Sequence, residues 1–193
     1  MGDEAIEALL AVAAALEKLD IKYVVGGSYA SSAHGDPRST NDIDILAAIS
    51  VKQARALAAE LKDKFYADEL AIEHAIQAKR HFNVIDTETM FKVDIFPSKR
   101  TEFEKQQLER RQIAIIDPER NATAFVATAE DTILAKLAWY RLGGEVSELQ
   151  WRDILGVLKR QRKKLDFEYL RRWAADLEVS DLLNEAFADA EIG

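Results

Sequence analysis

One stretch of the chain, VVGGSYASSAHGDPRSTNDIDIL (residues 24–46), limits the possible folds more than any other. An apolar strand runs into two glycines and a serine, a polar loop follows, and the next apolar strand carries Asp42 and Asp44. Side chains alternate between the faces of a strand, so both aspartates share one face while Ile43 and Ile45 point into the core. Two neighbouring carboxylates repel each other unless a cation neutralises both. The pair therefore either faces solvent or holds a cation.

A third carboxylate repeats the pattern in FKVDIF (residues 91–96), where Asp94 lies between two apolar residues. If this strand is a neighbour of the DIDIL strand, three carboxylates converge. Mg²⁺, and also Mn²⁺, prefer such oxygen ligands. The sequence therefore predicts a metal site made of Asp42, Asp44 and Asp94, with an exposed strand edge as the alternative for Asp94.

The glycines suit the same chemistry. A strand that ends at Gly26 and Gly27 and opens a helix lets the backbone approach a phosphate, with helix N-terminal amides and the Ser28 hydroxyl directed at it. An ordinary turn is the alternative for the two glycines. Arg38 is a candidate to neutralise phosphate charge, and its alternative is a loop arginine paired with Asp36. The combined pattern is typical of a site that handles a nucleoside triphosphate with Mg²⁺.

Composition excludes several other classes of protein. The net charge of −8 argues against non-specific binding of duplex nucleic acid, because such binding needs many basic residues. The chain has no cysteine, which excludes disulfides, thiol catalysis and cysteine-ligated zinc. The apolar run at residues 9–16 is too short to span a bilayer, and no basic residues precede it as in a secretory signal. We expect a cytoplasmic protein with no membrane contact.

The order of strand and helix patterns predicts an α+β fold: a mixed sheet flanked by helices, followed by a C-terminal helical bundle. The catalytic unit covers residues 1–127 and the bundle residues 128–193. The expected strands are 21–27, 43–49, 81–86, 91–96 and 112–117. Strands 81–86 and 91–96 are expected to form a hairpin, and residues 118–122 a linker. The expected helices are 3–19, 28–33, 50–66, 99–111, 128–144, 147–161, 166–177 and 181–188.

GGSYASSAHGDPRSTNDIDI, with a third carboxylate on a later strand, resembles the signature of the nucleotidyltransferase superfamily, which has the DNA polymerase beta-like fold. The Arg-x-Thr sequence at Arg38 and Thr40 is similar to the branch that contains the abortive-infection toxin nucleotidyltransferases and their uncharacterised bacterial relatives. The resemblance is strongest over residues 24–46, extends to residues 93–96, and covers the helical tail only loosely. It implies a nucleotidyltransferase-like sheet in the first part of the chain.

The resemblance also implies roles for these residues. Gly27 and Ser28 would hold the triphosphate, and Asp42 and Asp44 would ligate Mg²⁺. Asp94 would complete the metal site and assist deprotonation of the attacking hydroxyl. The implied reaction is in-line displacement at the α-phosphorus with release of pyrophosphate, helped by two ions about 3.5–4 Å apart.

Two later segments, EDTILAKLAWY and QWRDIL, resemble parts of the toxin-like branch that contribute a lysine and an aspartate. This implies Lys136 as a triphosphate contact and Asp153 as a supporting or acceptor-side residue. The helix pattern leaves Lys136 at the margin of the apolar face, where a lysine often extends to solvent. The second aspartate often found one turn after the Arg-Asp pair is missing, and Gly156 and Val157 occupy that region.

The implied function is transfer of a nucleoside monophosphate from a nucleoside triphosphate such as ATP to an acceptor hydroxyl. A tRNA end, a protein side chain or a small hydroxylated molecule would each serve as acceptor. One alternative is a non-catalytic nucleotide- or metal-binding module with a partner protein, as in a toxin–antitoxin pair. Another is a phosphohydrolase of the haloacid-dehalogenase type, but Leu46 stands where that family has Ser or Thr.

Overall fold

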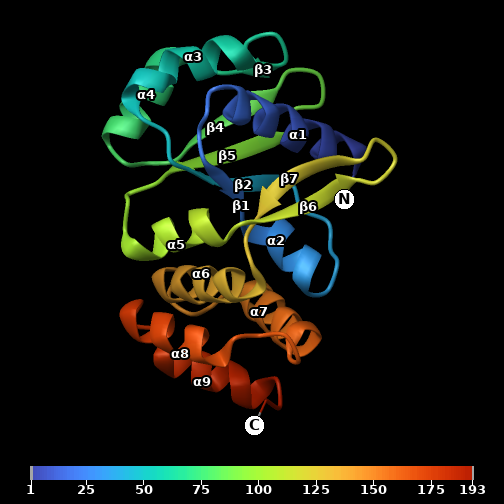
Figure 1. The fold of residues 1–193 in the computed structure, drawn as a ribbon, viewed down its shortest axis with the longest axis vertical. Coiled ribbons are helices and arrows are strands. Elements are labelled where there is room, and N and C mark those ends of the chain that lie inside the picture. The colour runs from blue at the N-terminus through green and yellow to red at the C-terminus, as the bar shows by residue number, and fades with distance from the viewer. Residues whose placement is uncertain (1, 193) are drawn as a thin grey trace. The chain divides into compact units, whose positions relative to one another are not determined.

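The computed structural model describes residues 2–192, and the chain divides into two compact units (Figure 1). The first unit contains the chain up to Gly26 together with Ser39–Val126, and the second contains Gly27–Arg38 together with the chain from Ala127 onward. A single boundary near residue 127 therefore does not describe the packing, because a segment of twelve residues from the N-terminal part belongs to the second unit. The assignment of residues 1–127 as the catalytic unit stays a prediction.

A seven-stranded mixed sheet is the centre of the first unit, with strand order β3-β4-β5-β2-β1-β7-β6. Strands β2 and β5 are parallel, as are β1 and β7, and the other neighbouring pairs are antiparallel. The predicted hairpin of β4 and β5 is confirmed. The strands are β1 (Tyr23–Val25), β2 (Asp42–Ala47), β3 (Phe65–Tyr66), β4 (Phe82–Asp86), β5 (Lys92–Pro97), β6 (Gln112–Asp117) and β7 (Ala122–Val126).

The helices of this unit are α1 (Asp3–Lys18), α3 (Val51–Leu61), α4 (Glu69–Gln77) and α5 (Glu102–Arg110), and α3 packs on α1 and α4. Helix α1 contacts β2, β5, β6 and β7 and also α3, whereas α5 contacts β1 and β2. Figure 1 shows α1, α3 and α4 on one side of the sheet and α5 on the other. The core between these layers is aliphatic and includes Leu9, Val12 and Ile43, which are fully buried.

Two expectations about the first unit are wrong. The helix expected over residues 50–66 ends at Leu61, and Phe65–Tyr66 forms the edge strand β3, which pairs with β4. Helix α4 follows, and the sequence pattern did not indicate it. The expectation that no strand follows residue 117 is also wrong, because β7 pairs with both β6 and β1. Both segments are short, and distant pairing partners rather than local periodicity determine their conformation.

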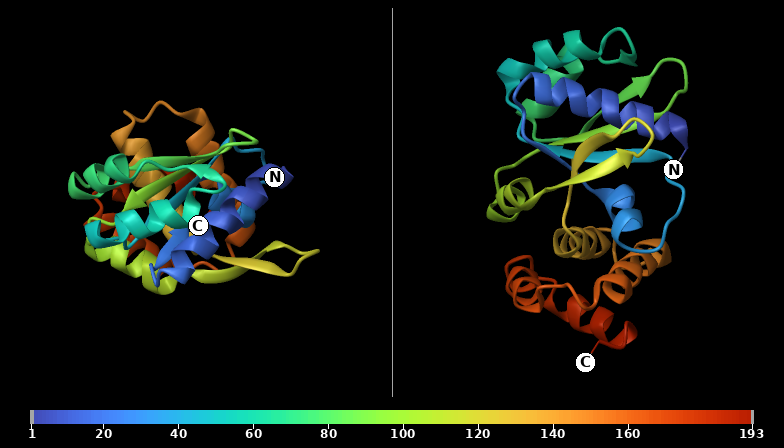
Figure 2. Two further views of the ribbon diagram at one scale, coloured as in Figure 1. Left: turned by 90° about the horizontal axis from the view of Figure 1, so that it is seen from above. Right: turned by 45° about the vertical axis from the view of Figure 1, so that its right-hand side comes forward.

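The second unit is helical, as predicted for the chain after residue 127. Helix α2 packs on α6 and α7, α8 packs on α6, and α9 contacts α7 and α8. The right-hand view of Figure 2 shows α8 and α9 side by side. The predicted N-cap is confirmed, since the Thr128 hydroxyl accepts a hydrogen bond from the Asp131 amide. The helices are α2 (Gly27–His34), α6 (Ala129–Leu142), α7 (Glu148–Gln161), α8 (Phe167–Asp176) and α9 (Ser180–Asp189). Within residues 2–192 we find no helix whose length and apolar character would let it cross a bilayer.

Candidate functional site

The carboxylate residues lie on two neighbouring strands of the first unit. Strands β2 and β5 are parallel and in register, with Asp44 beside Asp94 and Asp42 beside Lys92. The alternating residues Ile43 and Ile45 are fully buried, as expected for the opposite face of the strand. The predicted adjacency of the two strands is therefore confirmed, and it gathers three carboxylates and one ammonium group on one face of the sheet.

Lys92 is the direct partner of Asp94. Its Nζ atom lies 2.7 Å from Asp94 Oδ2, while the other oxygen of Asp94 is buried and has no hydrogen-bond partner among the described residues. The hydrogen bond to Asp94 raises the pKa of Lys92 above its usual range, and the negative charges of Asp42 and Asp44 contribute in the same direction. Lys92 therefore stays charged at neutral pH and compensates part of the negative charge of the three aspartates.

The backbone around the carboxylates is held by two further contacts. Thr40 Oγ1 lies 3.1 Å from Asp42 Oδ1 and 3.0 Å from the carbonyl oxygen of the same residue. The Gly26 amide donates to the Asp44 carbonyl at 2.9 Å, so that N–H group belongs to the sheet and is not offered to a phosphate. The Thr40 hydroxyl orients Asp42, which is one of the candidate metal ligands. Among the described residues, an added Cβ on Gly26 would meet no atom within 4 Å.

The donor set suits a hard divalent cation, because three carboxylates share one face and one buried oxygen of Asp94 lacks a partner. In the side-chain conformations of residues 2–192, however, no three His, Cys, Asp or Glu residues are already assembled as metal ligands. Asp94 is turned toward Lys92 instead. Binding of a metal ion therefore requires the carboxylates to rearrange around it.

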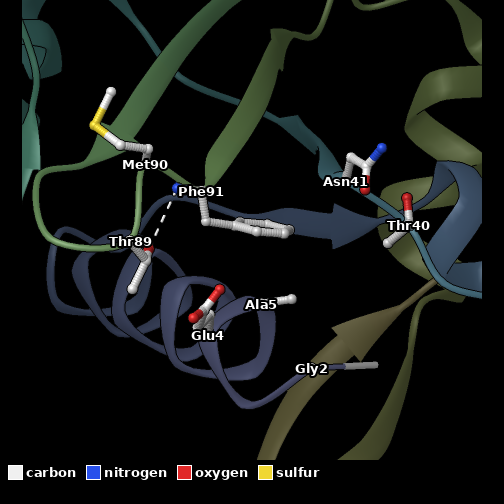
Figure 3. Close-up of a pocket in the computed structure, with 8 residues that line it drawn as sticks. All are labelled: Gly2, Glu4, Ala5, Thr40, Asn41, Thr89, Met90 and Phe91. Atoms are coloured by element: carbon white, nitrogen blue, oxygen red, sulfur yellow. Dashed lines mark hydrogen bonds between the residues drawn. The ribbon is translucent and has the colours of Figure 1, made fainter.

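The first unit also has a cavity of about 250 Å³, whose lining contains none of the three carboxylates (Figure 3). Its lining comes from the first turn of α1, the loop before β2 and the turn between β4 and β5. Thr40 links it to the carboxylates through its contact with Asp42. The lining residues are Gly2, Glu4, Ala5, Thr40, Asn41, Thr89, Met90 and Phe91. Except for Thr40, the sequence analysis missed this set, which is distributed over three distant segments.

The remaining candidate residues form a second cluster, inside the second unit. Asp153 on α7 accepts hydrogen bonds from Arg38 Nη2 at 2.8 Å and Arg38 Nε at 3.0 Å, and from Lys136 Nζ on α6 at 2.9 Å. The Ser31 hydroxyl lies 3.3 Å from the same carboxylate, and Arg38 Nη2 lies 2.5 Å from the Ser28 hydroxyl. The structure thus brings Ser28, Arg38, Lys136 and Asp153 together.

Two alternatives from the sequence analysis are wrong for this cluster. Arg38 pairs with Asp153, while Asp36 pairs with Arg160 at 2.8 Å. Lys136 does not extend to solvent, since only 10% of its side chain is exposed. Burial alone would raise the pKa of Asp153, but the hydrogen bonds from Arg38 and Lys136 outweigh this effect and lower it.

Close packing of α2 on α7 positions these groups. Gly27, with a φ of 53°, adopts a left-handed conformation that glycine tolerates best, at the start of α2. At the other end, a Cβ on Gly35 would lie 2.8 Å from Val157 N, and one on Gly156 would lie 3.3 Å from Asp36 N. A larger residue at position 156 would crowd Asp36 in the loop that follows α2.

A second cavity, of about 290 Å³, adjoins this cluster within the second unit. Its lining residues are Asp36, Pro37, Arg38, Arg152 and Asp153. Arg152 was not a candidate in the sequence analysis, although it precedes Asp153 directly. It adds a third basic side chain to the part of the second unit that holds Arg38 and Lys136.

Comparison with solved structures shows what this arrangement is similar to. The antibiotic-resistance factor ANT(2″)-Ia is 13% identical, with 98% of this chain and 99% of that chain aligned at a TM-score of 0.57. An antigenic nucleotidyltransferase-like protein from Paracoccidioides brasiliensis is 14% identical, with 98% and 93% aligned at a TM-score of 0.60. The chain has the nucleotidyltransferase fold.

The nucleotidyltransferase fold confirms the predicted α+β architecture with its C-terminal helices. The lincosamide antibiotic adenylyltransferase LnuA, in a lincomycin-bound structure, is also similar, at 13% identity and a TM-score of 0.50, with 81% of this chain and 96% of that chain aligned. No protein-family model matches the chain, and no curated protein matches its sequence. At these identities the likeness concerns the fold, and the chemistry must be argued from the residues.

Proposed function

We propose that the chain is a nucleotidyltransferase, dependent on Mg²⁺ or Mn²⁺, that moves a nucleoside monophosphate from a nucleoside triphosphate to an acceptor hydroxyl. The observation that carries the proposal is the register of β2 and β5, which sets Asp44 beside Asp94 with Asp42 on the same face. A sheet that only had to be stable would not gather three carboxylates there, because like charges destabilise the cluster.

In the proposed reaction the acceptor oxygen attacks the α-phosphorus, a new O–P bond forms, and the bond between the α-phosphorus and the β-phosphate oxygen breaks. Pyrophosphate leaves with the electron pair of that bond. The buried oxygen of Asp94 that lacks a partner is the candidate to take the hydroxyl proton. Asp42, Asp44 and Asp94 would hold a divalent ion, which would supply charge neutralisation at the transferred phosphate.

The cluster in the second unit is proposed to bind the triphosphate. Arg38 and Lys136 supply positive charge, and the Ser28 hydroxyl supplies a further polar group beside Arg38. Asp153 holds both cations in place. Positioning and charge neutralisation account for most of the catalysis of phosphoryl and nucleotidyl transfer. An ordered cluster of charged side chains is suited to both.

The acceptor is proposed to be a small hydroxylated molecule that enters the cavity beside Asp42. A space of about 250 Å³ suits a small molecule rather than a folded nucleic acid, and Glu4 in its lining favours a neutral or cationic one. The net charge of −8 points the same way. One similar structure contains adenylyl-2″-tobramycin and another contains lincomycin, so tobramycin and lincomycin are suitable first probes.

The test is thermal stabilisation of the purified chain by each of the four nucleoside triphosphates, with and without Mg²⁺. We expect a stabilisation that needs both the nucleotide and the metal and that disappears in Asp42→Asn. The matched control is Asp68→Asn, because Asp68 caps α4 outside the site and asparagine caps a helix equally well. Lys136→Ala should weaken nucleotide binding while leaving its metal dependence unchanged.

Turnover is then followed with α-labelled ATP in the presence of tobramycin or lincomycin. Metal-dependent stabilisation that is fully retained in both Asp42→Asn and Asp44→Asn would refute the proposed site. Stabilisation without transfer to any hydroxylated probe would instead support the non-catalytic nucleotide-binding module.

A further inference from the structure

One edge of the sheet in the first unit exposes apolar side chains. Strand β6 is the last strand in the sheet order, and within residues 2–192 it pairs only with β7. Its outer side therefore presents backbone amides and carbonyls to which a further strand can bond. Two of its side chains, Ile113 and Ile115, are 69% and 60% exposed. The strand at the other edge, β3, has only two residues, so β6 is the edge suited to a partner.

The two faces of β6 differ. Ile113 and Ile115 share one face, and Ile113 lies beside Phe125 of β7. Ala114 is on the other face beside Ala124, which is buried, and helix α1 contacts both strands. In the left-hand view of Figure 2 the end of the β6–β7 hairpin (yellow) extends beyond α1. One face of the edge is thus covered by the protein itself, while the isoleucine face lies open to solvent.

The order of charges along this segment indicates what pairs with it. Arg110 and Arg111 stand directly before β6, Asp117 ends the strand, and Glu119 follows in the turn. If two copies of the strand run antiparallel, the basic end of each meets the acidic end of the other. The segment is therefore complementary to itself in charge, as a two-fold interface between identical chains requires.

The sequence of β6 also defines a register. Antiparallel pairing centred on Ala114 sets Ile113 of each copy opposite Ile115 of the other. Residues directly opposite each other share a face, so the four isoleucine side chains cover one another on the exposed side of the sheet. The irregularity in the β6–β7 ladder lies between Ile115 and Asp117, beyond these pairs. It keeps the regular segment short, and we expect a reversible dimer.

We propose that β6 is a dimerisation edge: it pairs antiparallel with β6 of a second copy, continues the sheet through both chains and buries Ile113 and Ile115. The two observations that carry the proposal are the exposed isoleucine face of an edge strand and the self-complementary order of its flanking charges. The inference concerns assembly and is independent of the proposed function.

The experiment is sedimentation velocity of the full chain over a series of concentrations. The wild type should change from a monomer of 21.7 kDa to twice that mass as the concentration rises. The double variant Ile113→Lys with Ile115→Lys should stay monomeric throughout, because each lysine then faces a lysine of the other copy. The matched control is Leu70→Lys, since Leu70 is an apolar residue of α4 in the same unit that is 63% exposed. It should dimerise as the wild type does.

A charge-swap experiment tests the register. The variant Ile113→Glu with Ile115→Glu should also be monomeric alone, but an equimolar mixture with the lysine variant should restore the dimer, because every lysine then faces a glutamate. Far-UV circular dichroism checks the fold of each variant, and serine at both positions replaces the charged residues if they prevent folding.

Three results would overturn the inference. A wild-type chain that stays monomeric at every concentration leaves the edge to a strand of a different protein. A lysine variant that dimerises as well as Leu70→Lys shows that the interface lies elsewhere. A mixture of the lysine and glutamate variants that stays monomeric contradicts the antiparallel register.

Discussion

Replacing Asp153 with asparagine tests the charge cluster of the second unit directly. The carboxylate is 5% exposed and accepts hydrogen bonds from both Arg38 and Lys136. Asparagine keeps the shape of the side chain but removes the negative charge, so the buried Lys136 ammonium loses its counter-charge. Breaking a buried ion pair by removing one partner typically costs about 3–5 kcal/mol of unfolding free energy.

This magnitude is large beside the total stability of a protein of this size, which is about 5–15 kcal/mol. At about 2–4 °C per kcal/mol for a chain of 150–250 residues, the melting temperature should fall by roughly 6–20 °C. Urea unfolding followed by tryptophan fluorescence is the suitable assay, because all three tryptophans (Trp139, Trp151 and Trp173) belong to the second unit.

Asp181→Asn is the matched control. Asp181 also accepts from an arginine, with Arg141 Nη2 at 2.6 Å, but its side chain is 70% exposed, and exposed pairs contribute little. Adding Lys136→Met to Asp153→Asn should cost less than the sum of the two single variants, because the uncompensated ammonium is then absent. If Asp153→Asn destabilises no more than Asp181→Asn, the cluster is not a buried ion network and the reasoning fails.

The same residue predicts a pH dependence with a definite sign. Because the folded protein lowers the pKa of Asp153, its ion pairs stabilise the fold above the unfolded-state pKa, about 3.9, and this contribution is lost as the pH falls through the lower folded value. Urea midpoints measured between pH 7 and pH 3 should therefore fall less steeply in Asp153→Asn than in the wild type. Parallel curves would contradict this assignment.

Three further perturbations have distinct outcomes. Gly35→Ala places a Cβ 2.8 Å from the backbone N of Val157 and should lower the unfolding free energy by about 1–3 kcal/mol, measured from the urea midpoint. An unchanged midpoint would mean that α2 and α7 are not closely packed. Asp86→Ala removes a buried acceptor of the Thr89 amide at 3.0 Å and should lower the unfolding free energy by about 1–3 kcal/mol in urea, whereas a neutral result would show that water replaces the carboxylate. Asp42→Asn should leave the melting temperature in EDTA unchanged or slightly higher, because it relieves like-charge repulsion and keeps the oxygen that Thr40 contacts, and a clear drop would mean that the carboxylate is structural.

Local patterns in the sequence predicted much of this structure. The alternation in DIDIL and FKVDIF indicated which side of each strand the carboxylates occupy, and the register of β2 and β5 agrees. The serine and threonine caps and apolar spacing indicated the C-terminal helices, since capping and periodicity are properties of neighbouring residues. Where a segment was too short to show periodicity, as in β3 and β7, the same reasoning failed.

The partner of Arg38 shows the limit most clearly. Asp36 is two residues away in the sequence and was the natural alternative, yet Arg38 bonds Asp153, 115 residues further along the chain. Lys92 is a different case, because it lies two residues before Asp94 on β5 and strand alternation already places both side chains on one face; the sequence analysis did not single it out.

The sequence by itself determined the residue types, the faces of the carboxylate-bearing strands and the capped C-terminal helices, because backbone periodicity and capping act over a few residues. Only the tertiary structure decided which charges meet in the second unit, where Arg38 and Lys136 pair with Asp153. Ion pairing depends on distance and burial, and both are set by the packing of segments that lie far apart in the chain.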